Sequence, residues 1–200
     1  MHHHTTSRLG AASGLVAVIG LMALNSTASQ GTAVRGGELV ALMLFVPFLA
    51  YLCSVLRDGD GPGWLLITAL ASGLVAVTIK VASVIPEITV RHGDHGAALN
   101  DALEQLAEVS FIVSLLPLGL CLGAVAAIVL RTRVLPVWLG WMAALTAPLL
   151  VLNSFDHGSE FGPAFVLFLL WALCTSVVLL RRATTATAPG VMSPRRAVTS

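Results

Sequence analysis

Residues 64–85 read WLLITALASGLVAVTIKVASVI, an apolar run that contains a single charged residue, Lys80. A helix of this length rises about 33 Å at 1.5 Å per residue, enough to cross the roughly 30 Å hydrocarbon core of a bilayer. Charged residues then concentrate in 86–108, together with His92 and His95, although charged residues are scarce elsewhere. The stretch 62–108 therefore predicts a membrane helix, a polar loop and the start of a second membrane helix.

The composition excludes an ordinary soluble domain. Apolar residues make up 56% of the 200-residue chain and charged residues 10%, whereas soluble domains are about 25% charged. Mean hydropathy is +0.90. A net charge of +1 without a basic cluster among aromatic residues also argues against a nucleic-acid partner. The lipid bilayer is the partner that this composition predicts.

Six apolar runs of membrane-spanning length predict an all-α fold, a polytopic transmembrane helix bundle. The expected spans cover residues 9–28, 38–56, 64–85, 103–130, 136–153 and 163–180, within a membrane domain at 9–182. Residues 1–8 are expected to form a short polar head. Residues 183–200, rich in Thr, Ala and Pro, have too little apolar surface to fold and are expected to be a disordered tail.

Three features of the spans carry further expectations. Pro86 is expected to end the third span. Gly10 and Gly14 have the GxxxG spacing that lets helices approach closely, which favours a retained first helix over a cleaved secretory signal. The histidines at positions 2–4 follow Met1 directly and are not candidate site residues.

The arginines predict which side of the membrane each connection occupies. Successive connections between spans lie on opposite sides of the membrane, which places eight arginines on one side and two on the other. Cytoplasmic loops are the ones enriched in Lys and Arg. The larger group is Arg8, Arg57, Arg131, Arg133, Arg181, Arg182, Arg195 and Arg196; the smaller is Arg35 and Arg91. Most acidic residues fall on the opposite side. Both termini are therefore expected to be cytoplasmic, in a bacterial inner membrane.

Lys80 is the first candidate functional residue. Small and polar residues recur around it at helical spacing, and such a stripe faces other helices rather than lipid. The stripe comprises Ala69, Gly73, Ala76, Lys80, Ser83 and Glu87. The functional interpretation is a buried cation paired with Glu108 or Asp156 on a solute or proton path. The alternative is a side chain that snorkels to the interface or forms a structural ion pair.

Two further groups of polar residues lie on the same predicted side. Glu104 and Glu108 are one helical turn apart, where they could share a proton or bind a cation, or simply form a solvated helix start. The tripeptide Asp-His-Gly occurs at 94–96 and at 156–158, and His92 completes HxxH. Together with Asn153, these residues complete the predicted polar cluster: Lys80, Glu87, Glu104, Glu108, Asn153, Asp156 and His157.

Metal binding is a weak alternative for the same loops; the others are pH-sensitive contacts made by their histidines and plain polar loops without a site. Histidine and carboxylate ligands from two loops can assemble a divalent-metal site. The candidates are His92, Asp94, His95, Asp156 and His157, but neither loop contains a cysteine and the HxxH includes a glycine. No cofactor is predicted, because no phosphate-binding loop, dinucleotide fingerprint or haem-attachment motif is present.

The stretch 119–153 resembles a known membrane hairpin. A small-residue helix leads into Leu-Arg-Thr-Arg-Val-Leu-Pro, which is followed by Val-Trp-Leu-Gly-Trp and another apolar helix. This pattern is similar to that of uncharacterised bacterial multi-pass proteins, the domain-of-unknown-function type with an LPxWLG hairpin. The resemblance covers about a third of the chain and implies membrane placement and fold, without catalytic residues to transfer.

The leading functional hypothesis is a non-enzymatic membrane protein that binds a partner or senses a signal at its outward acidic and histidine-bearing surface. The first alternative is a small solute or proton-coupled transporter that uses Lys80 with Glu108 and Asp156. The second is a metal-dependent membrane enzyme. A second membrane protein or another copy of this chain is a possible partner in each case.

Overall fold

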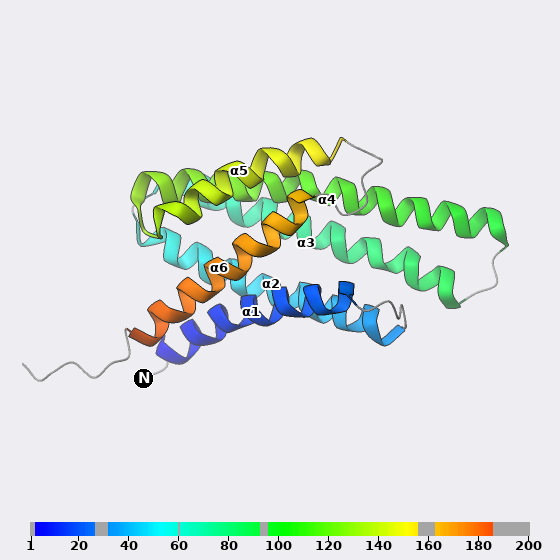
Figure 1. Ribbon diagram of the computed structural model, residues 1–200, viewed down its shortest axis with the longest axis horizontal. Helices are drawn as coiled ribbons and strands as arrows, with labels where there is room; N and C mark the ends of the chain where they lie inside the picture. The colour runs from blue at the N-terminus through cyan, green and yellow to red at the C-terminus, as the bar shows by residue number, and fades with distance from the viewer. Residues whose placement is uncertain (1–2, 27–31, 60, 93–95, 156–162, 186–200) are drawn as a thin grey trace, which may run out of the picture.

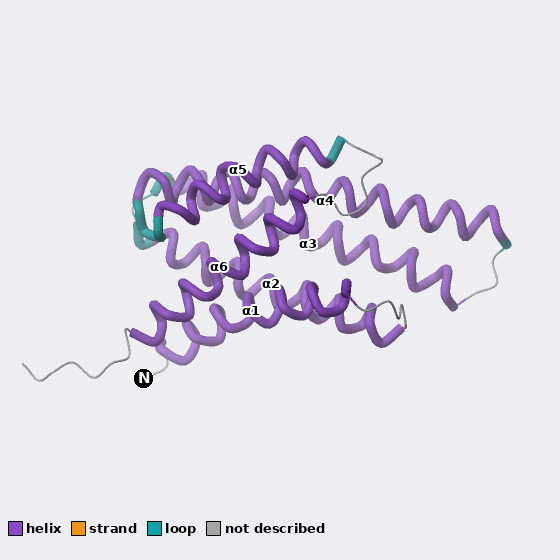
Figure 2. Tube along the Cα trace, in the orientation of Figure 1, coloured by secondary structure: helices purple, strands orange, loops and turns teal. Residues whose placement is uncertain are grey.

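The computed structural model describes residues 3–26, 32–59, 61–92, 96–155 and 163–185, and these are almost entirely helical (Figure 1, Figure 2). The six helices are α1 (His3–Ser26), α2 (Thr32–Arg57), α3 (Gly63–His92), α4 (Ala97–Thr132), α5 (Val137–Asn153) and α6 (Pro163–Thr185). The all-α prediction is confirmed for the described residues. Four helices (α2, α3, α4 and α6) are individually long and apolar enough to cross a membrane, and α1 and α5 contain shorter apolar segments. The protein is thus built as a multi-pass membrane protein.

The helices form a closed ring in chain order. Each helix packs against the next, and α1 packs against α6, which closes the ring; contact across it, between α2 and α4, is slight. The interior is filled by large buried side chains from most of the helices, among them Phe48, Leu52, Leu122, Leu139 and Leu179. Outward-facing positions carry exposed Leu, Ile, Val and Trp, as expected of helices that face lipid.

Glycines set the closest approaches between helices. A Cβ at Gly14 would lie 2.6 Å from Ser176 Oγ of α6 and would collide with the Phe48 ring of α2. A Cβ at Gly119 would lie 2.9 Å from the Ala147 carbonyl oxygen of α5. The expected close helix approach at Gly14 is therefore confirmed, and it occurs within one chain.

The α3–α4 hairpin extends beyond the other helices (Figure 1). At 1.5 Å per residue, α3 is about 45 Å long and α4 about 54 Å, against roughly 30 Å of hydrocarbon. This extension corrects the expectation that the third span ends at Pro86, because α3 continues through it to His92. One proline removes a single helical hydrogen bond, and the packing of α4 along α3 supports the rest of the helix.

Several other helices also extend beyond the predicted spans. α1 begins at His3, inside the expected polar head, and α6 ends at Thr185, beyond the expected start of the tail. Helix α4 begins at Ala97, with Gly96 as its N-cap at φ 75°. Residues 186–200 lie outside the described part of the chain.

Candidate functional site

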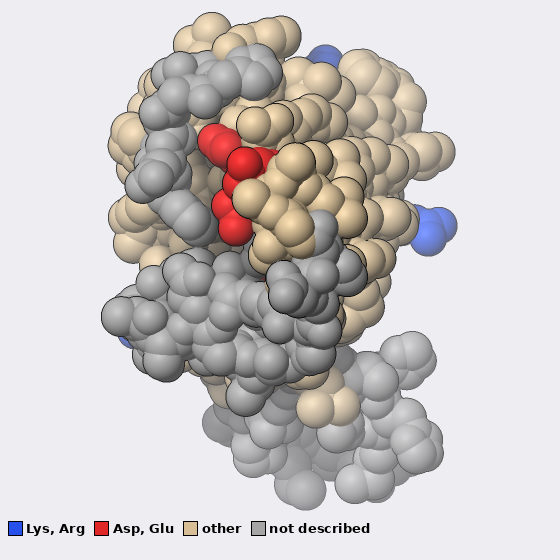
Figure 3. Space-filling model, turned by 90° about the vertical axis from the view of Figure 1, so that its right-hand side faces the viewer, with Lys and Arg blue, Asp and Glu red and all other residues tan. Residues whose placement is uncertain are grey.

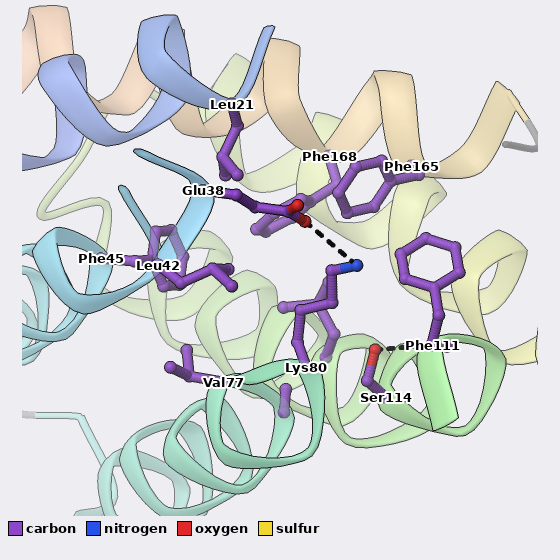
Figure 4. Close-up of a pocket in the computed structure, with 12 residues that line it drawn as sticks. Leu21, Glu38, Leu42, Phe45, Val77, Lys80, Phe111, Ser114, Phe165 and Phe168 are labelled. Atoms are coloured by element: carbon purple, nitrogen blue, oxygen red, sulfur yellow. Dashed lines mark hydrogen bonds and ion pairs between the residues drawn. The ribbon is translucent and has the colours of Figure 1, made fainter. Parts of the chain in front are cut away.

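A small cavity opens within the ring at the end from which the α3–α4 hairpin extends (Figure 4). Its volume is about 50 Å³, enough for a few water molecules. Five helices contribute to its walls, which places it inside the ring rather than on its outer face. The lining residues are Leu21, Glu38, Leu42, Phe45, Ala76, Val77, Lys80, Phe111, Ser114, Leu118, Phe165 and Phe168.

An ion pair crosses this cavity. Lys80 Nζ of α3 lies 3.3 Å from Glu38 Oε1 of α2, and the two side chains are 15% and 7% exposed. A charge removed from water this far is costly unless it is paired, so each group stabilises the burial of the other. The pair also joins α2 directly to α3.

Aromatic rings complete the surroundings of the Lys80 ammonium group. Its Nζ lies 4.5 Å from the centre of the Phe111 ring, within the range of a cation–π interaction. The Phe165 ring meets Phe111 edge-on with centroids 5.5 Å apart, and Phe168 lies 6.0 Å from Phe165. A carboxylate together with the faces of phenylalanine rings is a set of groups that favours an organic cation.

The depth of the pair follows from helix geometry. About 28 Å of helix separates Glu38 from Arg57 at the end of α2, and about 26 Å separates Lys80 from Gly63 at the start of α3. The exposed arginines 57, 131, 133, 181 and 182 are all at helix ends or turns on that side of the bundle. If that arginine-bearing end lies at one membrane interface, the cavity lies close to the other.

The structure corrects one of the two expected partners of Lys80. Among the described residues Glu38, rather than Glu108, supplies the carboxylate. Glu108 is exposed on α4 and does not line the cavity, because Phe111 occupies the α4 position that faces Lys80. Asp156 lies outside the described residues. The predicted small-residue face of α3 is confirmed, since Ala69, Gly73, Ala76 and Ser83 are buried.

The remaining predicted site residues are only partly brought together. Glu104 and Glu108 are exposed on the part of α4 that extends from the ring, along with Asp101. Acidic side chains gather on the face of the molecule seen from this end (Figure 3). Asn153 is half-buried at the end of α5. Glu87 and His92 belong to α3, but their side chains are outside the described set.

The candidate metal ligands cannot be assembled from the described residues. Asp94, His95, Asp156 and His157 lie in segments outside the description, and no group of three or more potential ligands occurs within it. The cysteines at 53, 121 and 174 are free and sit within helices, as expected of packing residues.

Glu38 is the site residue that the sequence analysis missed, although a signal for it existed. The buried face of α2 repeats at helical spacing through Leu42, Phe45, Leu49 and Leu52, and Glu38 stands one turn before Leu42 on the same face. A carboxylate that continues an apolar stripe points toward the bundle interior, where it requires a cation. Lys80 is the one lysine in the chain.

Comparisons with protein families, with curated proteins and with solved structures give no match for this chain.

Proposed function

We propose that this protein is a non-enzymatic membrane receptor whose cavity recognises a small molecule with an ammonium group. The observation that carries the proposal is the position of the protein's own Lys80, whose ammonium lies between the Glu38 carboxylate and the Phe111 ring. In this proposal Lys80 acts as a tethered cation that a ligand displaces, and displacement breaks the link between α2 and α3.

Electrostatics favours a cation over an anion as the ligand. An ammonium group that replaces Lys80 keeps the buried Glu38 carboxylate paired. An anion bound to Lys80 would displace Glu38 and separate its buried carboxylate from the Lys80 ammonium, which is strongly unfavourable. The negative faces of the surrounding rings also disfavour an anion. The exposed carboxylates of Asp101, Glu104 and Glu108 add a local field that attracts cations to this end.

The division of the arginines supports an orientation in which both termini are cytoplasmic and the cavity opens on the outer side of a bacterial inner membrane. A ligand would then arrive from outside the cell. Loss of the α2–α3 ion pair is the change that would be transmitted through the bundle to the cytoplasmic turns.

The experiment is a ligand series measured in lipid nanodiscs by thermal unfolding. Butylammonium, butanol and butyrate share an alkyl chain and differ in charge. We expect butylammonium alone to stabilise the Lys80→Met variant, which lacks the ammonium group beside Glu38 and Phe111, and to stabilise the wild type at higher concentrations. The Glu38→Gln/Lys80→Met double variant, which lacks the carboxylate, is the control and should lose this response.

Two outcomes would reject the proposal. Equal stabilisation by butanol and butylammonium would mean that the cavity recognises the alkyl chain and not the charge. A response confined to the Lys80→Met variant, with a wild type that stays unaffected at saturating concentrations, would mean that Lys80 is a permanent structural partner of Glu38.

A transporter is the second candidate, and the prolines beside the cavity favour it. Pro47 is two residues from Phe45 in α2, and Pro117 adjoins Leu118 in α4, so two helices that line the cavity have potential hinges next to it. In proteoliposomes a carrier would move labelled alkylammonium across the bilayer, and Lys80→Met would abolish this flux. Binding without flux supports the receptor.

A further inference from the structure

An exposed apolar stripe runs along α4 on the side away from the ring. Its members repeat at alternating steps of three and four residues, which is the heptad pattern of a helix that packs against another helix. The stripe consists of Leu99, Ala102, Leu106, Val109, Val113, Leu116 and Leu120. The six larger side chains are between 39% and 55% exposed. The stripe is therefore continuous over about six helical turns.

Lipid accounts for only part of this stripe. Measured from Arg131 at 1.5 Å per residue, Leu120 lies about 16 Å away and Val113 about 27 Å, inside a hydrocarbon layer of roughly 30 Å. Leu106 lies about 37 Å away and Leu99 about 48 Å, beyond that layer. Apolar side chains at that height would face water and headgroups unless another protein surface covers them.

The residues beside the stripe fit a second copy of the same helix. Positions 103, 105, 110 and 112, which flank the seam in the heptad, are Leu, Gln, Ser and Ile, so no charge there opposes self-association. The carboxylates of Asp101, Glu104 and Glu108 fall at heptad positions on the outer side, away from the seam. A partner selected by charge would find no complementary charge on these flanks.

Membrane insertion adds a geometric argument for self-pairing. All copies of a membrane protein share one sidedness, so a two-fold axis along the membrane normal brings identical helices together in parallel and in register. Each stripe residue then meets its own counterpart, which is the pairing of a parallel coiled coil. Complete coverage of the stripe by a second copy would bury roughly 500 Å² per copy, or about 1,000 Å² in total, the lower limit for a specific interface.

From these observations we infer that the protein forms a parallel homodimer through the α4 stripe at Leu99–Leu120. The stripe ends after Leu120, because the next position in the pattern, Gly123, faces Ala147 of α5. The contact is thus made by α4 from Leu99 to Leu120, including the part that extends beyond the ring. This inference is independent of the ligand proposed for the cavity, which lies on the opposite side of α4.

The test is oxidative cross-linking of the full chain in native membranes. In a background with Cys53, Cys121 and Cys174 replaced by Ala, single cysteines are introduced at Leu106 and Val109 on the stripe. The matched control is Glu104→Cys, which is also exposed on the same part of α4. We expect disulfide-linked dimers at least tenfold more abundant for the two stripe positions than for the control.

A second measurement separates association from folding. The Leu106→Glu variant places a charge on the seam above the hydrocarbon layer, where the helix itself is exposed and its folding should be unaffected. In nanodiscs sized for two copies, it should be monomeric at concentrations where the wild type is dimeric. Cross-linking independent of helix face, a folded wild type that is monomeric, or a trimer would overturn the inference.

Discussion

Replacing Lys80 by Met is expected to lower the free energy of unfolding by about 3 kcal/mol. The substitution keeps an unbranched side chain of similar length and removes the charge, so the main consequence is electrostatic. It removes the Lys80 ammonium from the Glu38 carboxylate, whose side chain is 7% exposed. The cost is that of burying a carboxylate that has lost this counter-charge in a cavity lined mostly by apolar groups.

The geometry of the pair sets the magnitude. Two unit charges 3.3 Å apart attract by about 5 kcal/mol at an effective dielectric constant of 20 and by about 1 kcal/mol in bulk water. Removing one partner of a fully buried pair costs about 3–5 kcal/mol. The Lys80 side chain is 15% exposed, so the lower end of that range applies. Adding Glu38→Gln should recover about 2 kcal/mol, because no buried charge then remains.

The assay is a double-mutant cycle on Lys80→Met and Glu38→Gln, with unfolding equilibria measured in bicelles. Thr78→Met, at an exposed position two residues away on α3, is the matched control and should change stability by less than about 0.5 kcal/mol. A coupling energy below about 0.5 kcal/mol between positions 38 and 80 would refute the reasoning. It would mean that both groups reach water in the folded protein.

Three other expectations follow from the packing and the charge pattern. Gly14→Ala should lower the free energy of unfolding by about 1–3 kcal/mol, because the added Cβ overlaps α2 and α6. In the same unfolding assay the matched Gly36→Ala, whose Cβ would have nothing within 4 Å, should be neutral or slightly stabilising. Trp171→Phe should cost about 1–2 kcal/mol, since Trp171 Nε1 donates a buried hydrogen bond to an α5 carbonyl 3.1 Å away; unchanged stability would show that the bond is absent. In a cysteine-free background, Glu104→Cys should react with an impermeant maleimide in intact cells and Asp58→Cys only after lysis, and the reverse pattern would invert the proposed orientation.

The fold was largely accessible from the sequence because membrane helices obey one strong constraint. Backbone groups in hydrocarbon must be satisfied within the segment, so long apolar runs become helices whatever their neighbours do. The ends of the helices were harder to predict. Outside the hydrocarbon no such constraint applies. Pro86 predicts a helix end, but α3 continues to His92 because it packs against α4.

Only one of the two paired residues in the candidate site, Lys80, was predicted from the sequence. The stripe around Lys80 correctly indicated a face turned toward other helices, because its small residues leave room for neighbours. The identity of the opposing carboxylate depends on the rotation of α2 about its own axis and on the order of helices around the ring. Spacing within one helix contains neither quantity. Of the two carboxylates expected beside Lys80, Glu108 is exposed on α4 and Asp156 lies outside the described residues.

The depth of the ion pair argues against a carrier site in this cavity. A carrier site open alternately to both sides lies near the middle of the bilayer, whereas Lys80 and Glu38 lie about 26–28 Å from the arginine-bearing end by helix rise. Below them the ring is closed by fully buried side chains such as Phe48, Leu49 and Leu122. A ligand of the proposed kind that entered from the hairpin end would therefore meet the charge pair first and a packed interior next. This arrangement favours recognition at one interface over passage across the membrane.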